Sequence, residues 1–303
     1  MSHSSDFLTF TLPPSPHSSL PSTTSALPPD FSLLLTDTLD APATFLIVQL
    51  VARALRPAQP EPGRRAEKRR RVVVVGVRER EDHWAGTLKK HGIQLATESS
   101  ARRFSFVDAS SPSTTLPDLF ASLRAALAPS SPQPGEGPSQ APQRDGPADA
   151  EQPGPLVVID DLSALLWIGR EPREVVRWWR GVRAFVGERS GSLVTLLHAD
   201  TLSPSPSLHA PSSASSSPYA SPEDQYLFRQ VLQACDLWAE IVGLGNGGTG
   251  ARGELSLHRA PALVPRGWSV DALPRSGSRA LQYKLDEGGA VWEVKGQMGG
   301  KVW

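Results

Sequence analysis

Short apolar runs alternate along the chain with longer stretches in which apolar positions recur at helical spacing. The five apolar runs are 31–35, 72–75, 104–107, 156–159 and 192–197. Runs this short and this apolar are typical of strands buried between helix layers in a parallel sheet. Amphipathic patterns between them predict helices at 43–56, 80–92, 115–127, 172–187 and 223–234. The alternation predicts an α/β fold, a three-layer sandwich around a mainly parallel sheet.

The last part of the chain has a different pattern, in which apolar and polar residues alternate one by one. The alternating apolar positions lie on both sides of a Gly288–Gly289 pair: Leu281, Tyr283, Leu285, Ala290, Trp292 and Val294. A double glycine between two alternating strands is typical of a β-hairpin. We therefore expect antiparallel strands over 281–295, extending the parallel sheet.

Proline marks the segments that do not fit either pattern. The chain has 29 prolines in 303 residues, about twice the usual frequency of ~5%. They gather with Ser, Gly and Gln at 1–29, 57–71, 128–155, 201–222 and 260–280. Such compositions bury too little apolar surface to offset the entropy of ordering. We predict that residues 1–29 form a disordered N-terminal extension. Residues 30–303 are predicted to form a single domain with long Pro/Ser-rich loops.

The overall composition excludes several classes of protein. With 31 basic and 31 acidic residues the chain is neutral, so any contact with nucleic acid has to come from a local patch. A single Cys excludes a disulfide framework. There is neither a secretory signal nor an apolar run of the ~20 residues that a spanning helix needs. We expect a cytoplasmic location and leave a nuclear one open.

An α/β sheet raises the question of nucleotide binding, and the first strand-to-helix connection argues against it. A P-loop needs glycines and a lysine to cradle phosphates. Residues 35–44 contain neither, and they place Asp37 and Asp40 where negative charge would repel phosphate. Thr44 could imitate a magnesium-binding hydroxyl, but a threonine that opens a helix is more often a cap. We therefore predict no P-loop and no bound cofactor.

Acidic and nucleophilic residues elsewhere form no recognisable catalytic set. The run ending in Asp160–Asp161 resembles a Walker B strand, although we favour a role of either aspartate in capping the next turn. We expect His198, at the end of a strand, to be hydrogen-bonded and not to act as a base. Cys235 lies among apolar residues and is expected to be buried. The histidines show no metal-binding spacing.

Positive charge is concentrated in one part of the chain. Residues 51–103 contain 14 Lys or Arg and 6 Asp or Glu. Arg69, Arg70 and Arg71 at the end of a basic segment are candidate contacts for an RNA backbone. The alternative is a solvated connector that keeps the following apolar strand from aggregating. We leave both interpretations open.

The predicted helix 172–187 suggests a second candidate surface. Its core face carries Val175, Trp179, Val182 and Val186. Outside that face lie the candidate interface residues Arg173, Arg177, Trp178 and Arg180. Because Arg and Trp are enriched in interface hot spots, this helix is a candidate contact with another subunit. The alternative is that Trp178 covers the edge of the domain's own sheet.

Two segments resemble the family of Elongator complex protein 6. They are the apolar strand with its Asp160–Asp161–Leu162–Ser163 ending, within 156–169, and the terminal hairpin over 281–296 with its Gln282–Tyr283–Lys284 sequence. The helix opening at Thr44 and the strand ending at His198 match this family less specifically.

The resemblance implies a RecA-like ATPase fold that has lost its P-loop and carries no catalytic residue. It also implies a hetero-hexameric ring with Elongator proteins 4 and 5. That ring binds tRNA and serves the remaining Elongator core subunits in modifying the wobble uridine, U34. Two other readings stay open: an active RecA- or KaiC-like ATPase, and a recombination-mediator paralogue that binds single-stranded DNA.

Overall fold

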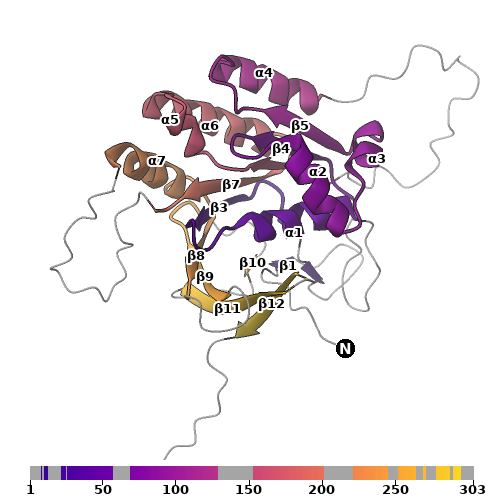
Figure 1. The fold of residues 1–303 in the computed structure, drawn as a ribbon, viewed down its shortest axis with the longest axis vertical. Coiled ribbons are helices and arrows are strands. Elements are labelled where there is room, and N and C mark those ends of the chain that lie inside the picture. Colours follow the sequence, from indigo (N-terminus) through magenta and orange to yellow (C-terminus); the bar gives the residue numbers. More distant parts are fainter. Residues whose placement is uncertain are drawn as a thin grey trace, which may run out of the picture.

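The protein folds around one large β-sheet, which is seen in a computed structural model (Figure 1). The structure describes residues 8, 10–12, 22–24, 26–56, 69–128, 153–200, 221–244, 252–263, 269–270, 278–286 and 289–294. Most of the predicted loops 57–71, 128–155 and 201–222 lies outside these residues, namely 57–68, 129–152 and 201–220. No helix in the described ranges combines the length and apolar character that crossing a membrane requires.

Six neighbouring strands of this sheet run parallel to one another. In order across the sheet they are β8 (Leu237–Gly243), β3 (Ser32–Asp37), β7 (Ser192–His198), β6 (Leu156–Ile159), β4 (Val72–Gly76) and β5 (Phe104–Asp108). Five of them match the predicted apolar runs, and β8 lies where no strand was predicted. Every residue of β3, β4, β6 and β7 is buried, which explains why their sequences are apolar on both faces.

Helices cover both faces of the parallel strands, so that the fold has three layers (Figure 1). One face packs against α1 (Thr44–Leu55), α2 (Glu81–Lys90) and α3 (Leu95–Ser100). The other packs against α4 (Leu116–Ala126), α5 (Ala164–Trp167), α6 (Pro172–Gly187) and α7 (Pro222–Leu232). Successive strand residues face opposite layers: Leu33 and Leu35 pack in the first core and Leu34 in the second. The predicted α/β sandwich is confirmed.

Antiparallel strands extend the sheet beyond β8. They are β9 (Arg252–Arg259), β11 (Ser278–Asp286) and β12 (Gly289–Val294). Within the hairpin, Tyr283 pairs with Trp292 and Leu281 with Val294, as the alternating pattern predicts. The bend is shifted by one residue, because Asp286 pairs with Gly289 and the latter belongs to the strand.

The prediction that residues 1–29 are disordered is wrong for the part that the structure describes. β1 (Phe10–Leu12) and β2 (Ser22–Thr24) pair with each other, and β1 also pairs with β10 (Ser269–Val270). Leu8 and Phe10 are fully buried, and the ring of Phe10 packs edge-on against Phe31 at 5.3 Å. Composition alone did not indicate strand β1, because its partner β10 lies some 260 residues away in the chain.

Candidate functional site

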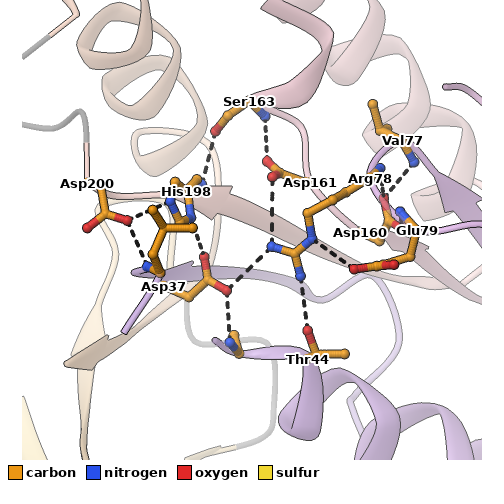
Figure 2. A network of polar contacts seen from close by, with 12 residues as sticks. Asp37, Thr44, Val77, Arg78, Glu79, Asp160, Asp161, Ser163, His198 and Asp200 are labelled. Atoms are coloured by element: carbon orange, nitrogen blue, oxygen red, sulfur yellow. Dashed lines mark hydrogen bonds and ion pairs between the residues drawn. The ribbon is translucent and has the colours of Figure 1, made fainter. Parts of the chain in front are cut away.

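The carboxyl ends of β3, β4, β6 and β7 meet at one edge of the sheet. The chain leaves β3 toward α1 on one face and leaves β7 toward α7 on the other face. Ligands of open α/β sheets bind where neighbouring strands diverge in this way. The polar residues that follow the four strands converge there in one network, which Figure 2 shows. This network is the candidate functional site.

His198 lies between two aspartates at the end of β7. Its Nδ1 atom is 3.0 Å from Oδ1 of Asp37, and its Nε2 atom is 2.6 Å from Oδ2 of Asp200. The hydrogen bond to Asp37 raises the pKa of His198, and burial opposes this rise. Both ring nitrogens can then donate, as in a charged imidazolium. His198 is thus hydrogen-bonded, as predicted, and its two carboxylate neighbours favour its charged form.

Asp160 accepts hydrogen bonds from the backbone of the loop that follows the neighbouring strand β4. Its Oδ1 accepts from the amide nitrogens of Val77 at 2.6 Å and Arg78 at 3.1 Å, and its Oδ2 accepts from that of Glu79 at 3.0 Å. Burial raises the pKa of Asp160, while these three N–H groups act in the opposite direction. The capping role predicted for this residue is realised in a different way, since the turn that it caps follows β4 and not its own strand β6.

Asp161 performs the local capping role that the sequence predicts for the Asp160–Asp161 pair. Its Oδ1 accepts from the backbone nitrogen of Ser163 at 3.0 Å. Its Oδ2 has no hydrogen-bond partner among the described residues. Burial raises the pKa of Asp161 to about 7, with Asp37 adding to the rise and Arg78 opposing it. This carboxyl group therefore changes its charge near neutral pH.

Arg78 holds the centre of the network, and the sequence did not point to it. Figure 2 shows its guanidinium between the ends of β3, β6 and α1. It donates to Oγ1 of Thr44 at 3.0 Å and lies 3.9 Å from Asp37 and 4.0 Å from Asp161. Its Nε is 3.5 Å from Glu79. One arginine therefore compensates the acidic residues of three strand ends.

In the connection between β3 and α1, two backbone N–H groups that a phosphate-binding loop would leave free are bound by carboxylates. The N–H of Leu39 donates to Asp200 at 2.7 Å, and that of Ala43 donates to Asp37 at 2.8 Å. The N–H of Ala41 donates to the carbonyl of Thr38 at 3.0 Å, and Pro42 has no N–H. The Thr44 hydroxyl accepts from Arg78 and does not cap the helix.

A magnesium nucleotide, which the predicted RecA-like class would imply, does not fit these residues. Phosphate binding needs inward-facing N–H groups and a positive surround, whereas here N–H groups are bound to Asp37 and Asp200. The Arg78 guanidinium already lies between the Thr44 hydroxyl and the Asp161 carboxylate. No cluster of three or more His, Cys, Asp or Glu side chains able to hold a metal occurs among the described residues.

The three candidate RNA contacts differ in their surroundings. Arg70 is 6% exposed and donates to the carbonyls of Leu27, Gly154 and Pro155 and to Oγ of Ser192. The prediction that Arg70 contacts RNA is therefore wrong, because its guanidinium is used inside the fold. Arg69 is exposed, and Arg71 is half-buried with one bond to the carbonyl of Ala128 at 2.8 Å.

The candidate interface on α6 also divides into two parts. Arg173, Arg177 and Arg180 are exposed, and Arg180 donates to Gln230 of α7 at 2.7 Å. Trp178 is 7% exposed and belongs to the core on that face of the sheet. The placement of Trp178 on an external interface is therefore wrong, because its side chain packs in the core of this face of the sheet. Cys235 is buried as predicted, and burial raises the pKa of its thiol to about 12.

Exposed apolar side chains gather around the same edge of the sheet. Leu39, Trp167, Val242 and Leu244 are four of the five large apolar residues that are exposed in the described part of the chain. The Trp167 ring packs edge-on against His198 at 5.7 Å. The Gly243 backbone lies against Asp40 and Ala41, because a Cβ added at Gly243 would meet their Cβ atoms at 3.7 and 3.6 Å.

No protein-family model and no curated protein sequence matches this chain. Its fold matches 421 chains of solved structures. One is the crystal structure of a KaiC-like protein from the hyperthermophilic archaeon Pyrococcus horikoshii OT3. That protein is 12% identical with a TM-score of 0.50, over 88% of this chain and 91% of that chain. At this identity the likeness concerns the fold alone. The chain therefore has a RecA-like α/β fold, as predicted, with its sheet and helices arranged as in this KaiC-like protein.

Proposed function

We propose that this chain is a non-catalytic subunit of the Elongator complex. In this proposal it forms a hetero-hexameric ring with Elongator proteins 4 and 5, in the cytoplasm and with a nuclear location left open. The ring binds tRNA and supports the modification of the wobble uridine U34 by the remaining core subunits. The RecA-like fold supports the class of subunit, and the resemblance of the Asp160–Ser163 strand ending and of the terminal hairpin supports the family.

One observation carries the non-catalytic part of the proposal. The guanidinium of Arg78 and the carboxylates of Asp37 and Asp161 fill the edge of the sheet where a nucleotide would bind. A triphosphate at this position would lie beside two buried carboxylates, which repel it. It would also have to displace the side chains that already bind the N–H groups of Leu39 and Ala43. At this edge the positive charge of Arg78 offsets the negative charges of Asp37 and Asp161.

The same edge supports a role in assembly. Leu39 is 81% exposed and Trp167 is 53% exposed, and exposed apolar residues that lie together mark sites of protein association. Asp200 and His198 fix the base of this surface, since Asp200 binds both the Leu39 N–H and the His198 ring. In our proposal the surface of Leu39, Trp167, Val242 and Leu244 contacts a neighbouring ring subunit. This choice replaces α6, whose predicted apolar anchor Trp178 is buried.

Affinity purification of the tagged full-length chain, followed by mass spectrometry, tests the proposal. We expect Elongator proteins 4 and 5 in amounts equal to the bait, and cells lacking the chain should lose carboxymethyl-type modification of U34. Recovery of recombinases in their place would select the recombination-mediator alternative. A chain that hydrolyses ATP by itself would select the ATPase alternative.

Two matched variants identify the surface used for assembly. The double substitution Leu39→Asp and Trp167→Ala changes the carboxyl edge, while Arg173→Ala and Arg177→Ala change the exposed face of α6. All four residues are exposed, so both variants should keep the fold, which circular dichroism checks. We expect the first variant to lose the sister subunits and the second to retain them. The reverse result would indicate that the interface with the sister subunits lies on α6.

A further inference from the structure

We propose that the amino-terminal edge of β4 and β5 binds the phosphate backbone of double-helical RNA. The surface consists of Arg56, Arg69, Arg71, Lys89, Lys90 and Arg102, and we call it the amino-edge basic surface. It lies at the end of the strands opposite to the network of Arg78. The inference rests on the tRNA-binding part of the proposed function and adds to it the surface of this chain that would contact RNA.

Backbone contacts bring the basic segments together at this edge. The N–H of Arg70 donates to the carbonyl of Ala54 at the end of α1, at 2.8 Å. The N–H of Val72 donates to the carbonyl of Arg103 at 2.7 Å, which places residues 69–71 beside the start of β5. Through its side chain, Arg56 donates to the carbonyl of His91, just after the end of α2. The side chain of Arg71 donates to the carbonyl of Ala128, just after α4, at 2.8 Å. The segments 52–56, 69–71, 87–103 and 123–128 thus share one surface.

Basic residues outnumber acidic ones in the described part of this surface. Apart from Arg53 and the buried Arg70, the described residues 52–56, 69–71, 87–103 and 123–128 contain eight Lys or Arg and a single acidic residue, Glu98. Glu98 is paired with Arg103 at 2.5 Å. Burial lowers the pKa of Arg71, and the charge of Arg102 lowers it further. His91 shows the same combination, since burial and then Arg56 lower its pKa.

Stabilisation of helix ends does not account for this charge. Basic residues in the last turn of a helix interact favourably with its negative C-terminal end, and Arg53, Lys89 and Arg124 can have that role in α1, α2 and α4. Arg69, Arg71 and Arg102 lie outside the helices. The longer helix α6 has no basic residue in its last turn and is followed by Glu188. The excess is therefore specific to the edge of β4 and β5.

The side chains at this edge fit a phosphate backbone better than unpaired bases. Arginine binds phosphate with two parallel N–H groups, and lysine binds it as a point charge. Sites for single strands add aromatic side chains on which bases stack. The four segments of this surface, residues 52–56, 69–71, 87–103 and 123–128, contain no Phe, Tyr or Trp. Recognition by charge alone favours a duplex, in which phosphates are closely spaced, and makes binding independent of sequence.

Charge reversal at two exposed residues tests the inference, with a matched control elsewhere. The test variant is Arg69→Glu with Lys89→Glu, and the control is Arg173→Glu with Arg177→Glu on α6; all four residues are exposed. Both change the net charge equally. The probe is a duplex RNA of about 20 base pairs, long enough to cover several phosphates, and the protein is the full chain assembled with Elongator proteins 4 and 5.

We expect the test variant to bind the duplex at least tenfold more weakly, and to reduce the slope of log K against log salt concentration by about 2, one per lost phosphate contact. The control should change affinity less than twofold. Equal losses in both variants, no loss in the test variant, or tighter binding of single-stranded DNA than of duplex RNA would each overturn the inference.

The experiment separates this inference from the proposed function. If the ring assembles and binds RNA but the test variant is unaffected, this surface is wrong and the Elongator proposal stands. If the chain does not assemble with the sister subunits, the same variants are measured in the chain alone. A selective loss of duplex binding by the test variant then supports the surface while the Elongator proposal fails.

Discussion

Nδ1 of His198 lies 3.0 Å from Oδ1 of Asp37, and the two residues are register partners on the neighbouring strands β7 and β3. The interaction links two strands whose following helices lie on opposite faces of the sheet. Asp200 adds a second carboxylate to the ring and also holds the N–H of Leu39. The histidine and Asp200 thus tie the start of the connection between β3 and α1 to the end of β7.

Replacing His198 with glutamine should destabilise the fold by about 1 to 3 kcal/mol at pH 6, because Asp37 and Asp200 each lose a neighbouring cation. The pKa of His198 is raised above 6.5 in the folded state. Its stabilising contribution is therefore fully present below about pH 6.5 and is lost as the pH rises through the folded-state pKa. Urea unfolding of both proteins from pH 5.5 to 9 measures this difference, which should narrow toward high pH.

The control for this substitution is His83→Gln. His83 is exposed at 42% and lies 3.4 Å from Glu79, so its loss should change the free energy of unfolding by less than about 0.5 kcal/mol. A difference between wild type and His198→Gln that widens with rising pH would contradict the charged imidazolium.

Asp161→Asn should stabilise the protein increasingly as the pH rises toward neutral. Burial raises the pKa of Asp161 to about 7, so its protonated form favours the folded state. That contribution is present below the ordinary value near 3.8 and is lost as the pH rises to about 7. The free energy of unfolding of the variant, relative to wild type, should rise by up to about 1.4 kcal/mol per pH unit within that window. Above the window this difference should be constant.

Asp108→Asn serves as the matched control for Asp161. Asp108 is exposed at the end of β5, and its hydrogen bonds with Ser110 lower its pKa. Its charge therefore stays constant between pH 5 and 8, and the difference from wild type should not depend on pH there. Chemical denaturation at pH 5, 6, 7 and 8 compares the two variants. Parallel stability curves for wild type and Asp161→Asn would refute the assignment.

Arg78→Met should lower the free energy of unfolding by about 2 kcal/mol at pH 7, because Asp37 and Asp161 lose the cation near them. The side chain of Arg78 is 28% exposed, and water therefore offsets part of the cost. Because Arg78 holds the pKa of Asp161 down, the variant should also shift the titration of that carboxyl above pH 7. Arg78→Lys keeps the charge but not the planar fork, and we expect an intermediate loss.

Arg70→Lys tests whether this arginine is structural. The guanidinium of Arg70 donates to the carbonyls of Leu27, Gly154 and Pro155, a geometry that a lysine ammonium does not reproduce. We expect thermal unfolding to show that Arg70→Lys lowers the free energy of unfolding by about 2 to 3 kcal/mol. Arg69→Lys, at an exposed neighbour, should change this free energy little. Equal stability of the two variants would mean that Arg70 contributes no more than its exposed neighbour.

The apolar runs predicted most of the parallel sheet but not β8. The strands β3, β4, β6 and β7 are buried on both faces, so each appears as a continuous apolar segment. In β8 buried and partly exposed residues alternate, and Glu240 lies in its middle. That strand lies where the sheet changes from parallel to antiparallel. Its alternating pattern is typical of a strand with one buried face, and it forms no continuous apolar run.

The members of the polar network were visible in the sequence only one at a time. Asp37, Asp160, Asp161 and His198 each follow or end an apolar run, which marks them as strand-end residues. Their meeting depends on the strand order, in which β7 and β6 separate β3 from β4. Nothing in the local sequence sets that order. Arg78 follows β4 in the same way as the aspartates follow their strands, and this position was the one available signal for it.

Binding of Mg-ATP to the purified chain, followed by isothermal titration calorimetry, tests the central claim most directly. That claim is that Arg78, Asp37 and Asp161 fill the edge of this RecA-like fold at which a nucleotide would bind. We predict no saturable binding up to about 1 mM nucleotide, an affinity weaker than about −4 kcal/mol. Saturable binding in the micromolar range that is lost on substitution of Thr44 would contradict the account.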